Sequence, residues 1–462
     1  MSDNICTKLF EKFGIITAVI LSIMQLTGYV INTGIPTDAF LISLLILPLR
    51  WVYLYRMSDI SKNFVRFFLW TGWDLSMVAM PILMFNQYSL NIFTAMSGER
   101  FLYRPDDVAF CIKTGTYALA VCFFASVWWK NTKEPNFDYF PNLSKGQVIV
   151  LTIIGTGVIM SAITVAKLLG IGELGETSMA LPMKLTGVIT YLAFGFFTFF
   201  ELFILDAMLK KGIPFFVPFS IIIVISLFSA FGSLSKGALI MPISMLILYC
   251  IMTKRFDVPK AITILGVFVA AFILSSFLSA YRNSRSTFYS KGFGAEGADY
   301  SAIMFVHRIF SDGGTIMKIH SVMSLDDIKA HLKDYGYNPR LINTYLIDKT
   351  PSSSMHSSGC TTLVGSYMFG YTAMGIMTAL LSLISAWIDY RLPRAKGILA
   401  SSAFRTYIIF FFSTLFLPKL IINVFMDVFV SAYSPEAIFM ILTLLCYIIY
   451  VKFCCQKAPI SN

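Results

Sequence analysis

All four histidines of the chain lie between residues 282 and 360, at positions 307, 320, 331 and 356. Histidine is the side chain that exchanges protons most readily near neutral pH. His356 stands out because the polar stretch Pro351-Ser-Ser-Ser-Met-His356-Ser-Ser-Gly-Cys360 leads directly into an apolar run, which would hold the imidazole at a membrane surface. We predict that His356 exchanges a proton in the function of this protein, with ordinary loop polarity as the alternative. His307 is the second candidate, with a packed amphipathic helix as the alternative, while His320 and His331 are expected to contribute little.

Three cations are suited to holding an anion. Arg282 and Arg285 lie three residues apart, so they share one face if the preceding helix continues. Their guanidinium groups offer a planar fork of donors that matches phosphate. Lys236 lies in Gly232-Ser-Leu-Ser-Lys236-Gly237, a short link between two apolar runs, where free backbone N–H groups and a helix start also suit phosphate oxygens. The alternatives are headgroup anchoring by the arginines and a snorkelling lysine.

Several other chemistries lack the residues they need. No G-x-x-x-x-G-K-[ST] loop for a nucleotide occurs in the sequence. The paired acids Asp106-Asp107 and Asp326-Asp327 are adjacent, so their side chains diverge on a helix and are expected to be helix-end acids. The eight cysteines show neither a disulfide framework nor metal-ligand spacing. We therefore predict no metal and no cofactor.

The elements that must position these residues are membrane helices. Of the 462 residues 57% are hydrophobic and only 13% are charged, about half the charge content of a soluble domain. Nucleic acid is excluded as a partner because the 36 Lys and Arg are scattered between apolar runs. An all-α polytopic membrane protein of about 12 transmembrane helices is predicted. The expected spans are 13–32, 39–55, 67–86, 108–129, 147–169, 185–207, 214–231, 237–253, 261–281, 361–388, 398–417 and 437–451.

The chain is thereby divided into helices 1–9 (1–281), one long loop (282–360) and helices 10–12 (361–462). Lys and Arg concentrate in alternate short connections, and the opposite set holds only Arg100, Arg104, Lys184, Lys236 and Lys419. Because cations stay on the cytoplasmic side, both termini are expected there and the long loop on the outer side. Within that loop Tyr300–Phe310 has helical apolar spacing, and Ser324 is expected to cap a helix that runs to about Lys333 and ends before Gly336, Asn338 and Pro339.

The hairpin around Lys236, the pair Arg282/Arg285 before a long outer loop, and His356-Ser-Ser-Gly-Cys-Thr-Thr-Leu-Val-Gly-Ser-Tyr-Met-Phe-Gly370 together resemble the Wzy-type O-antigen polymerases. The order of these features covers most of the chain. One departure is Lys236, where family members commonly carry arginine; lysine keeps the charge but loses the bidentate fork.

The resemblance implies a glycosyltransferase fold shared with O-antigen ligases, in a bacterial inner membrane. Its substrate would be an oligosaccharide carried on undecaprenyl pyrophosphate, which needs neither nucleotide nor metal for activation. Arg282, Arg285, Lys236 and Arg308 would hold the pyrophosphate, His356 would be the base, and the long loop would close over the sugars. Membrane lipid and a chain-length regulator protein are the other partners in this interpretation.

Three rival functions remain open. An O-antigen ligase would use the same donor with a different acceptor. A lipid-linked oligosaccharide flippase or another secondary transporter would place charges inside its spans. A structural scaffold is the third. Charges that fall inside the expected spans or apolar stretches are Arg50, Asp74, Lys113, Lys167, Glu201, Asp206, Arg405 and Asp427.

Overall fold

The computed structural model describes residues 5–88, 92–94, 100–129, 139–170, 185–233, 237–253, 257–285, 311–347, 362–394, 401–411 and 435–457. Nearly all of the regular structure in these ranges is helical. The strands form two small antiparallel ribbons, β1 (Ile92–Thr94) with β2 (Arg100–Leu102) and β3 (Tyr139–Pro141) with β4 (Cys455–Lys457). The predicted all-α class is therefore confirmed apart from these ribbons.

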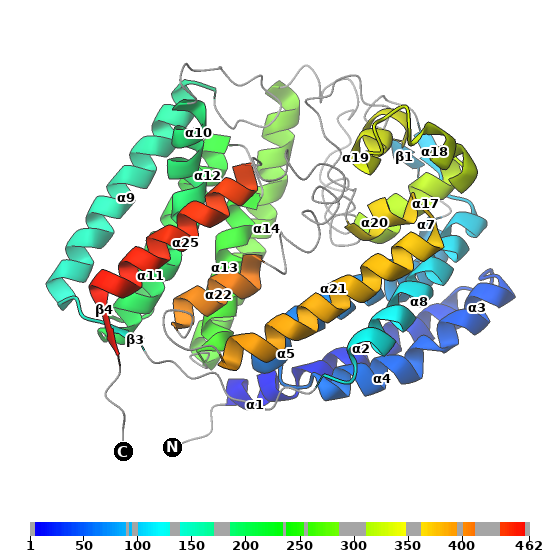
Figure 1. The fold of residues 1–462 in the computed structure, drawn as a ribbon, viewed down its shortest axis with the longest axis horizontal. Coiled ribbons are helices and arrows are strands. Elements are labelled where there is room, and N and C mark those ends of the chain that lie inside the picture. The colour runs from blue at the N-terminus through cyan, green and yellow to red at the C-terminus, as the bar shows by residue number, and fades with distance from the viewer. Residues whose placement is uncertain are drawn as a thin grey trace.

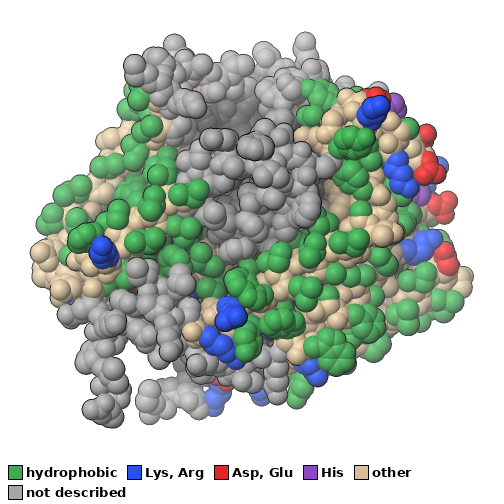
Figure 2. Space-filling model, in the orientation of Figure 1, with side chains coloured by type: hydrophobic (Ala, Val, Ile, Leu, Met, Phe, Trp, Pro, Cys, Tyr) green, Lys and Arg blue, Asp and Glu red, His purple; other side chains and the backbone are tan. Residues whose placement is uncertain are grey.

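Seven helical segments in the described part of the chain are long and apolar enough to cross a membrane: Phe13–Ile31, Thr37–Arg56, Pro105–Ser126, Lys145–Leu168, Tyr191–Lys210, Phe216–Ser233 and Tyr371–Arg394. Large apolar side chains point outward from them, for example Ile20, Ile23 and Leu26 on the first. Figure 2 shows such side chains spread over the sides of the molecule. Since exposed apolar faces of this extent suit lipid and not water, the chain is a multi-pass membrane protein.

A first bundle, on the right in Figure 1, is built mainly from the N-terminal third of the chain. Helix α8 lies at its centre and packs against α3, α4, α5, η1 and α21, while α2 packs against α4 and α6. Its elements are α1 (Ile5–Glu11), α2 (Phe13–Ile31), α3 (Thr37–Leu44), α4 (Ile46–Arg56), α5 (Ile60–Asp74), the π-helix η1 (Leu75–Ala79), α6 (Met80–Leu83), α7 (Phe85–Tyr88), α8 (Pro105–Ser126), α20 (Thr362–Tyr367), α21 (Tyr371–Arg391) and the 3-10 helix η5 (Leu392–Arg394).

A second bundle, on the left in Figure 1, is built from the middle of the chain and its C-terminal helices. Helix α11 packs against α9, α12, α13, α22 and α25, and α13 also contacts α14. Its elements are α9 (Lys145–Leu168), α10 (Leu185–Thr190), the π-helix η3 (Tyr191–Gly195), α11 (Phe196–Lys210), α12 (Phe216–Ser233), α13 (Gly237–Met252), α14 (Val258–Arg285), α22 (Ser402–Phe411) and α25 (Pro435–Cys454).

The described part of the long loop folds onto the first bundle. It contains α17 (Ser311–Val322), α18 (Leu325–His331), α19 (Pro339–Ile342) and the π-helix η4 (Asn343–Ile347), and α17 packs against α8 and η1. Figure 1 places α17–α19 at the end of the molecule opposite to α1 and β4. Ser324 accepts a hydrogen bond from the Asp327 amide at 3.2 Å, so the predicted N-cap is confirmed.

Several expected spans match helices closely; 13–32, for example, corresponds to α2. The expected span 361–388 corresponds to the candidate span Tyr371–Arg394, but it starts later than expected, because the chain breaks between α20 and α21 at Gly370, whose φ of 106° suits glycine. Over the expected span 67–86 the helix begins earlier, at Ile60, and has a kink at Asn63 before the π-helix η1. Helix α22 covers only Ser402–Phe411 of the expected 398–417, and 398–400 and 412–417 lie outside the described residues.

Candidate functional site at the loop-bearing end of the first bundle

Helix α17 is held on the first bundle by a close approach of two backbones. A Cβ atom at Gly313 would lie 2.0 Å from the carbonyl oxygen of Ser76 in η1, so this position must stay without a side chain. The Cys111 thiol is 3.6 Å from the Gly313 carbonyl oxygen, and the Tyr103 hydroxyl donates to the Gly314 carbonyl at 3.2 Å. These contacts fix the distance between α17 and α8.

Asp107 lies opposite the end of α17, in the first turn of α8. Its Oδ2 accepts a hydrogen bond from the backbone N–H of Arg104 at 2.8 Å, as the acid of a capping box. Its Oδ1 is 2.6 Å from Nδ1 of His320 and 3.3 Å from the Arg104 guanidinium. The Asp107 side chain is fully buried, whereas His320 is about one third exposed. The hydrogen bond to Asp107 raises the pKa of Arg104, which keeps this residue a cation.

An aromatic group surrounds the histidine. The Phe110 ring, one turn after Asp107, stacks on His320 with centroids 4.1 Å apart. Tyr367 from α20 and Tyr371 at the start of α21 continue this group, and the Tyr371 hydroxyl is 3.3 Å from that of Thr114. Tyr371 is 40% exposed, so the group reaches the surface. Asp326 and Asp327 of α18, and Lys333 and Asp334 just after it, carry exposed charges.

The pair His320–Asp107 has the arrangement of a general base and its orienting group. When Nδ1 carries the proton that Asp107 accepts, Nε2 is left as a proton acceptor. The carboxylate also stabilises the imidazolium that forms after proton transfer. The site can therefore take a proton from a hydroxyl group presented at this end of the bundle.

Most of the site residues predicted from the sequence lie outside the residues that the structure describes. Arg282 and Arg285 belong to the last turn of α14, as their spacing predicted, and only their backbone is described. Lys236, His307, Arg308 and His356 lie outside the described residues. The predicted role of each therefore stays a prediction.

The two histidines that we expected to contribute little differ from one another. His331 lies at an exposed end of α18, 3.3 Å from Asp334 in an i,i+3 pair. His320 instead has the buried carboxylate and the stacked ring. No local signal identified this pair, because Asp107 and His320 are separated by 213 positions. In the described ranges no group of three or more His, Cys, Asp or Glu could hold a metal ion.

Charges inside the first bundle are paired with one another. Arg50 donates twice to Asp74, at 2.6 and 2.7 Å, and both side chains are fully buried.

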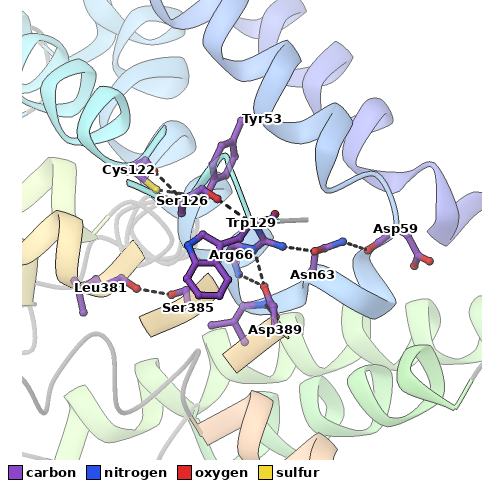
Figure 3. A network of polar contacts seen from close by, with 11 residues as sticks. Tyr53, Asp59, Asn63, Arg66, Cys122, Ser126, Trp129, Leu381, Ser385 and Asp389 are labelled. Atoms are coloured by element: carbon purple, nitrogen blue, oxygen red, sulfur yellow. Dashed lines mark hydrogen bonds and ion pairs between the residues drawn. The ribbon is translucent and has the colours of Figure 1, made fainter. Parts of the chain in front are cut away.

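At the end of the bundle near α1, the network in Figure 3 centres on Arg66, whose Nε lies 3.3 Å from Asp389 and whose Nη1 donates to the Trp129 carbonyl at 2.6 Å. Asp389 also accepts from the backbone N–H groups of Val65 and Arg66. These contacts join α5 to α21 and to the end of α8, which is a structural role.

Comparison of the chain with protein-family models, curated proteins and solved structures found no match.

Proposed function

We propose that this protein polymerises oligosaccharide repeat units carried on undecaprenyl pyrophosphate, at the outer face of a bacterial inner membrane. The observation that carries the proposal is His320, oriented by the buried Asp107 at the end of the molecule opposite to α1 and β4. The end of α14, with Arg282 and Arg285, is also near the top of Figure 1. The proposal includes about twelve spans, cytoplasmic termini and the glycosyltransferase fold shared with O-antigen ligases.

The proposed reaction is a substitution at the anomeric carbon of the donor sugar. The acceptor hydroxyl oxygen forms a bond to this carbon, the bond from the carbon to the pyrophosphate oxygen breaks, and undecaprenyl pyrophosphate leaves with the bonding electrons. The hydroxyl proton passes to the histidine base. Arg282, Arg285, Lys236 and Arg308 stabilise the charge that develops on the leaving pyrophosphate.

Two histidines compete for the role of base in this proposal. His356 comes from the sequence pattern at the start of an expected span. His320 is supported by its contact with Asp107 and by its stack on Phe110. His331, which pairs with an exposed acid on its own turn, is the matched control.

The test measures polymer formed by purified protein from purified lipid-linked repeats. Loss of a general base lowers the rate roughly 10²–10⁴-fold. We expect this loss for His320→Ala and, through misorientation of the ring, a smaller one for Asp107→Asn, while His331→Ala stays active. If His320→Ala polymerises normally and His356→Ala does not, the base is His356.

The arginines provide a second arm of the same assay. Removing one charge-stabilising donor commonly costs on the order of 3 kcal/mol of the barrier. Arg282→Ala and Arg285→Ala should therefore nearly abolish polymer without lowering the amount of protein in the membrane, and Lys236→Arg should be tolerated. Normal polymer from both alanine variants would reduce the arginines to headgroup anchors.

The rival functions are separated by the products in cells and by the acceptor in vitro. Deletion of a polymerase leaves one repeat on each surface lipid, whereas deletion of a ligase or flippase leaves none. Transfer to a lipid A core acceptor in the purified assay would identify a ligase. The transporter alternative is favoured by one observation, a buried acid in the second bundle, which also supports a separate inference.

A further inference from the structure

Glu201 lies near the midpoint of the apolar segment Tyr191–Lys210. At 1.5 Å per residue, about 15 Å of helix separates it from either end of that segment. Only 1% of its surface is exposed, and its Oε1 has no hydrogen-bond partner in the described part of the chain. An ionisable group at such a depth is costly and commonly marks a functional site.

Helix α11 packs against η3, α9, α12, α13, α22, α25 and the strand β3, so the charged residues around Glu201 can be enumerated; β3 contributes none with a described side chain. The titratable and charged residues with described side chains on α11 and on η3, α9, α12, α13, α22 and α25 are Asp206, Lys210, Tyr191, Lys145, Lys167, Tyr249, Cys250, Arg405, Tyr407, Cys446, Tyr447, Tyr450, Lys452 and Cys454. Helix α12 contributes none of them.

In the described part of the chain none of the cations among these residues forms an ion pair with Glu201. Lys210 pairs with Asp206 at 2.8 Å, and Asp206 also accepts from the hydroxyls of Tyr249, at 3.1 Å, and Ser402. Arg405 lines a crevice between the two bundles together with Lys62 and Asp389. Lys145 and Lys167 lie at the two ends of α9, and Lys452 lies in the last turn of α25. Nothing described here compensates a negative charge on Glu201.

A second buried polar side chain in this bundle is that of Tyr447, on α25, a helix that packs against α11. Tyr447 is fully buried, and its hydroxyl has no hydrogen-bond partner in the described ranges. Its ring packs on Phe199 of α11, with centroids 4.9 Å apart, so α25 covers α11 on that side.

We propose that Glu201, buried on α11 inside the second bundle, is a proton-binding site. An isolated carboxylate in an apolar interior costs far more than the neutral acid, so burial of this kind selects the protonated form. Release of the proton then requires water to reach α11. Proton occupancy is therefore linked to the packing of the second bundle around α11.

The first measurement is the melting temperature of the purified protein against pH. Between the pH at which the unfolded chain loses the Glu201 proton and the pH at which the folded chain does so, the folded state binds more protons, so the stability of the wild type falls as pH rises. Glu201→Gln removes the contribution of the Glu201 proton to this pH dependence. We expect the variant to melt close to the wild type in acid and above it in alkali.

The second measurement is infrared spectroscopy of the carbonyl stretch of protonated carboxylic acids. Wild type at neutral pH should show a band that Glu201→Gln lacks and that the control Asp206→Asn retains, since Asp206 is an ion-paired carboxylate. Glu201→Asp, which keeps the acid and shifts the band, provides the same test if the amide variant does not accumulate. A pH-independent difference in melting temperature, or an acid band unchanged by substitution of Glu201, would overturn the proposal.

Neither measurement involves lipid-linked sugar. The outcome is therefore independent of the proposed polymerase activity.

Discussion

The two bundles of this protein bury charge in different ways. In the first bundle Arg50 and Asp74 are joined by two short hydrogen bonds, of 2.6 and 2.7 Å, and Ser22 adds a hydroxyl 3.4 Å from the guanidinium. In the second, Asp206 has a comparable set of donors, but Glu201, little more than one turn away, has none described for its Oε1. The first arrangement fixes helices in place, while the second leaves a group whose charge can change.

The largest effect is expected from Arg50. Arg50→Met leaves Asp74 as an uncompensated buried charge, which commonly costs 3–5 kcal/mol, so the free energy of unfolding should fall by about that amount. The double variant Arg50→Met with Asp74→Leu should recover most of the loss. Chemical denaturation in detergent measures both, and equal losses in the single and double variants would show that the pair does more than compensate charge.

A smaller loss is expected at Asp206 in the second bundle. Asp206→Asn removes the negative charge that pairs with Lys210 and accepts hydrogen bonds from two hydroxyls. Hydrogen bonds to a charged group contribute roughly 1.5–3 kcal/mol. Denaturation at neutral pH should reveal a loss within that range. An unchanged free energy of unfolding would mean that the two acids of α11 do not differ as described.

The smallest effect is expected from the exposed ion pair of Lys113 and Asp38, which joins α8 to α3 at 2.8 Å. Its side chains are 36% and 59% exposed, so water and salt screen the attraction and its contribution to stability is small. Lys113→Met should change the melting temperature little, and high salt should erase the change. A loss of stability as large as that of Arg50→Met would show that the burial of an ion pair does not determine how much its removal destabilises this protein.

Much of the helical layout followed from local signals. Apolar runs bounded by charges located α2, α8 and α9 to within a few residues, and the Ser324 cap located α18. The break at Gly370 was missed because the apolar run continues on both sides of it. The π-helix η1 was missed because nothing in the composition of residues 75–79 distinguishes it from the α-helix before it; the close approach of Gly313 to Ser76 there is a tertiary contact.

The candidate site was less predictable than the helices. Asp107 was correctly expected to be a helix-end acid, and this role conceals its second contact with His320. A pair so distant in sequence forms only after α17 has packed on α8. The cations proposed to bind phosphate could be chosen from the sequence, because a guanidinium has the same chemistry wherever the chain places it.

The double use of Asp107 has a consequence for how this protein can vary. One carboxylate starts α8, through the Arg104 amide, and orients His320, through its other oxygen. Asparagine could still accept the cap hydrogen bond but would carry no charge for the imidazolium, and glutamate would move both oxygens away from the cap. The start of α8 and the orientation of the His320 ring therefore both depend on Asp107. A substitution at this position that changes one of them also changes the other.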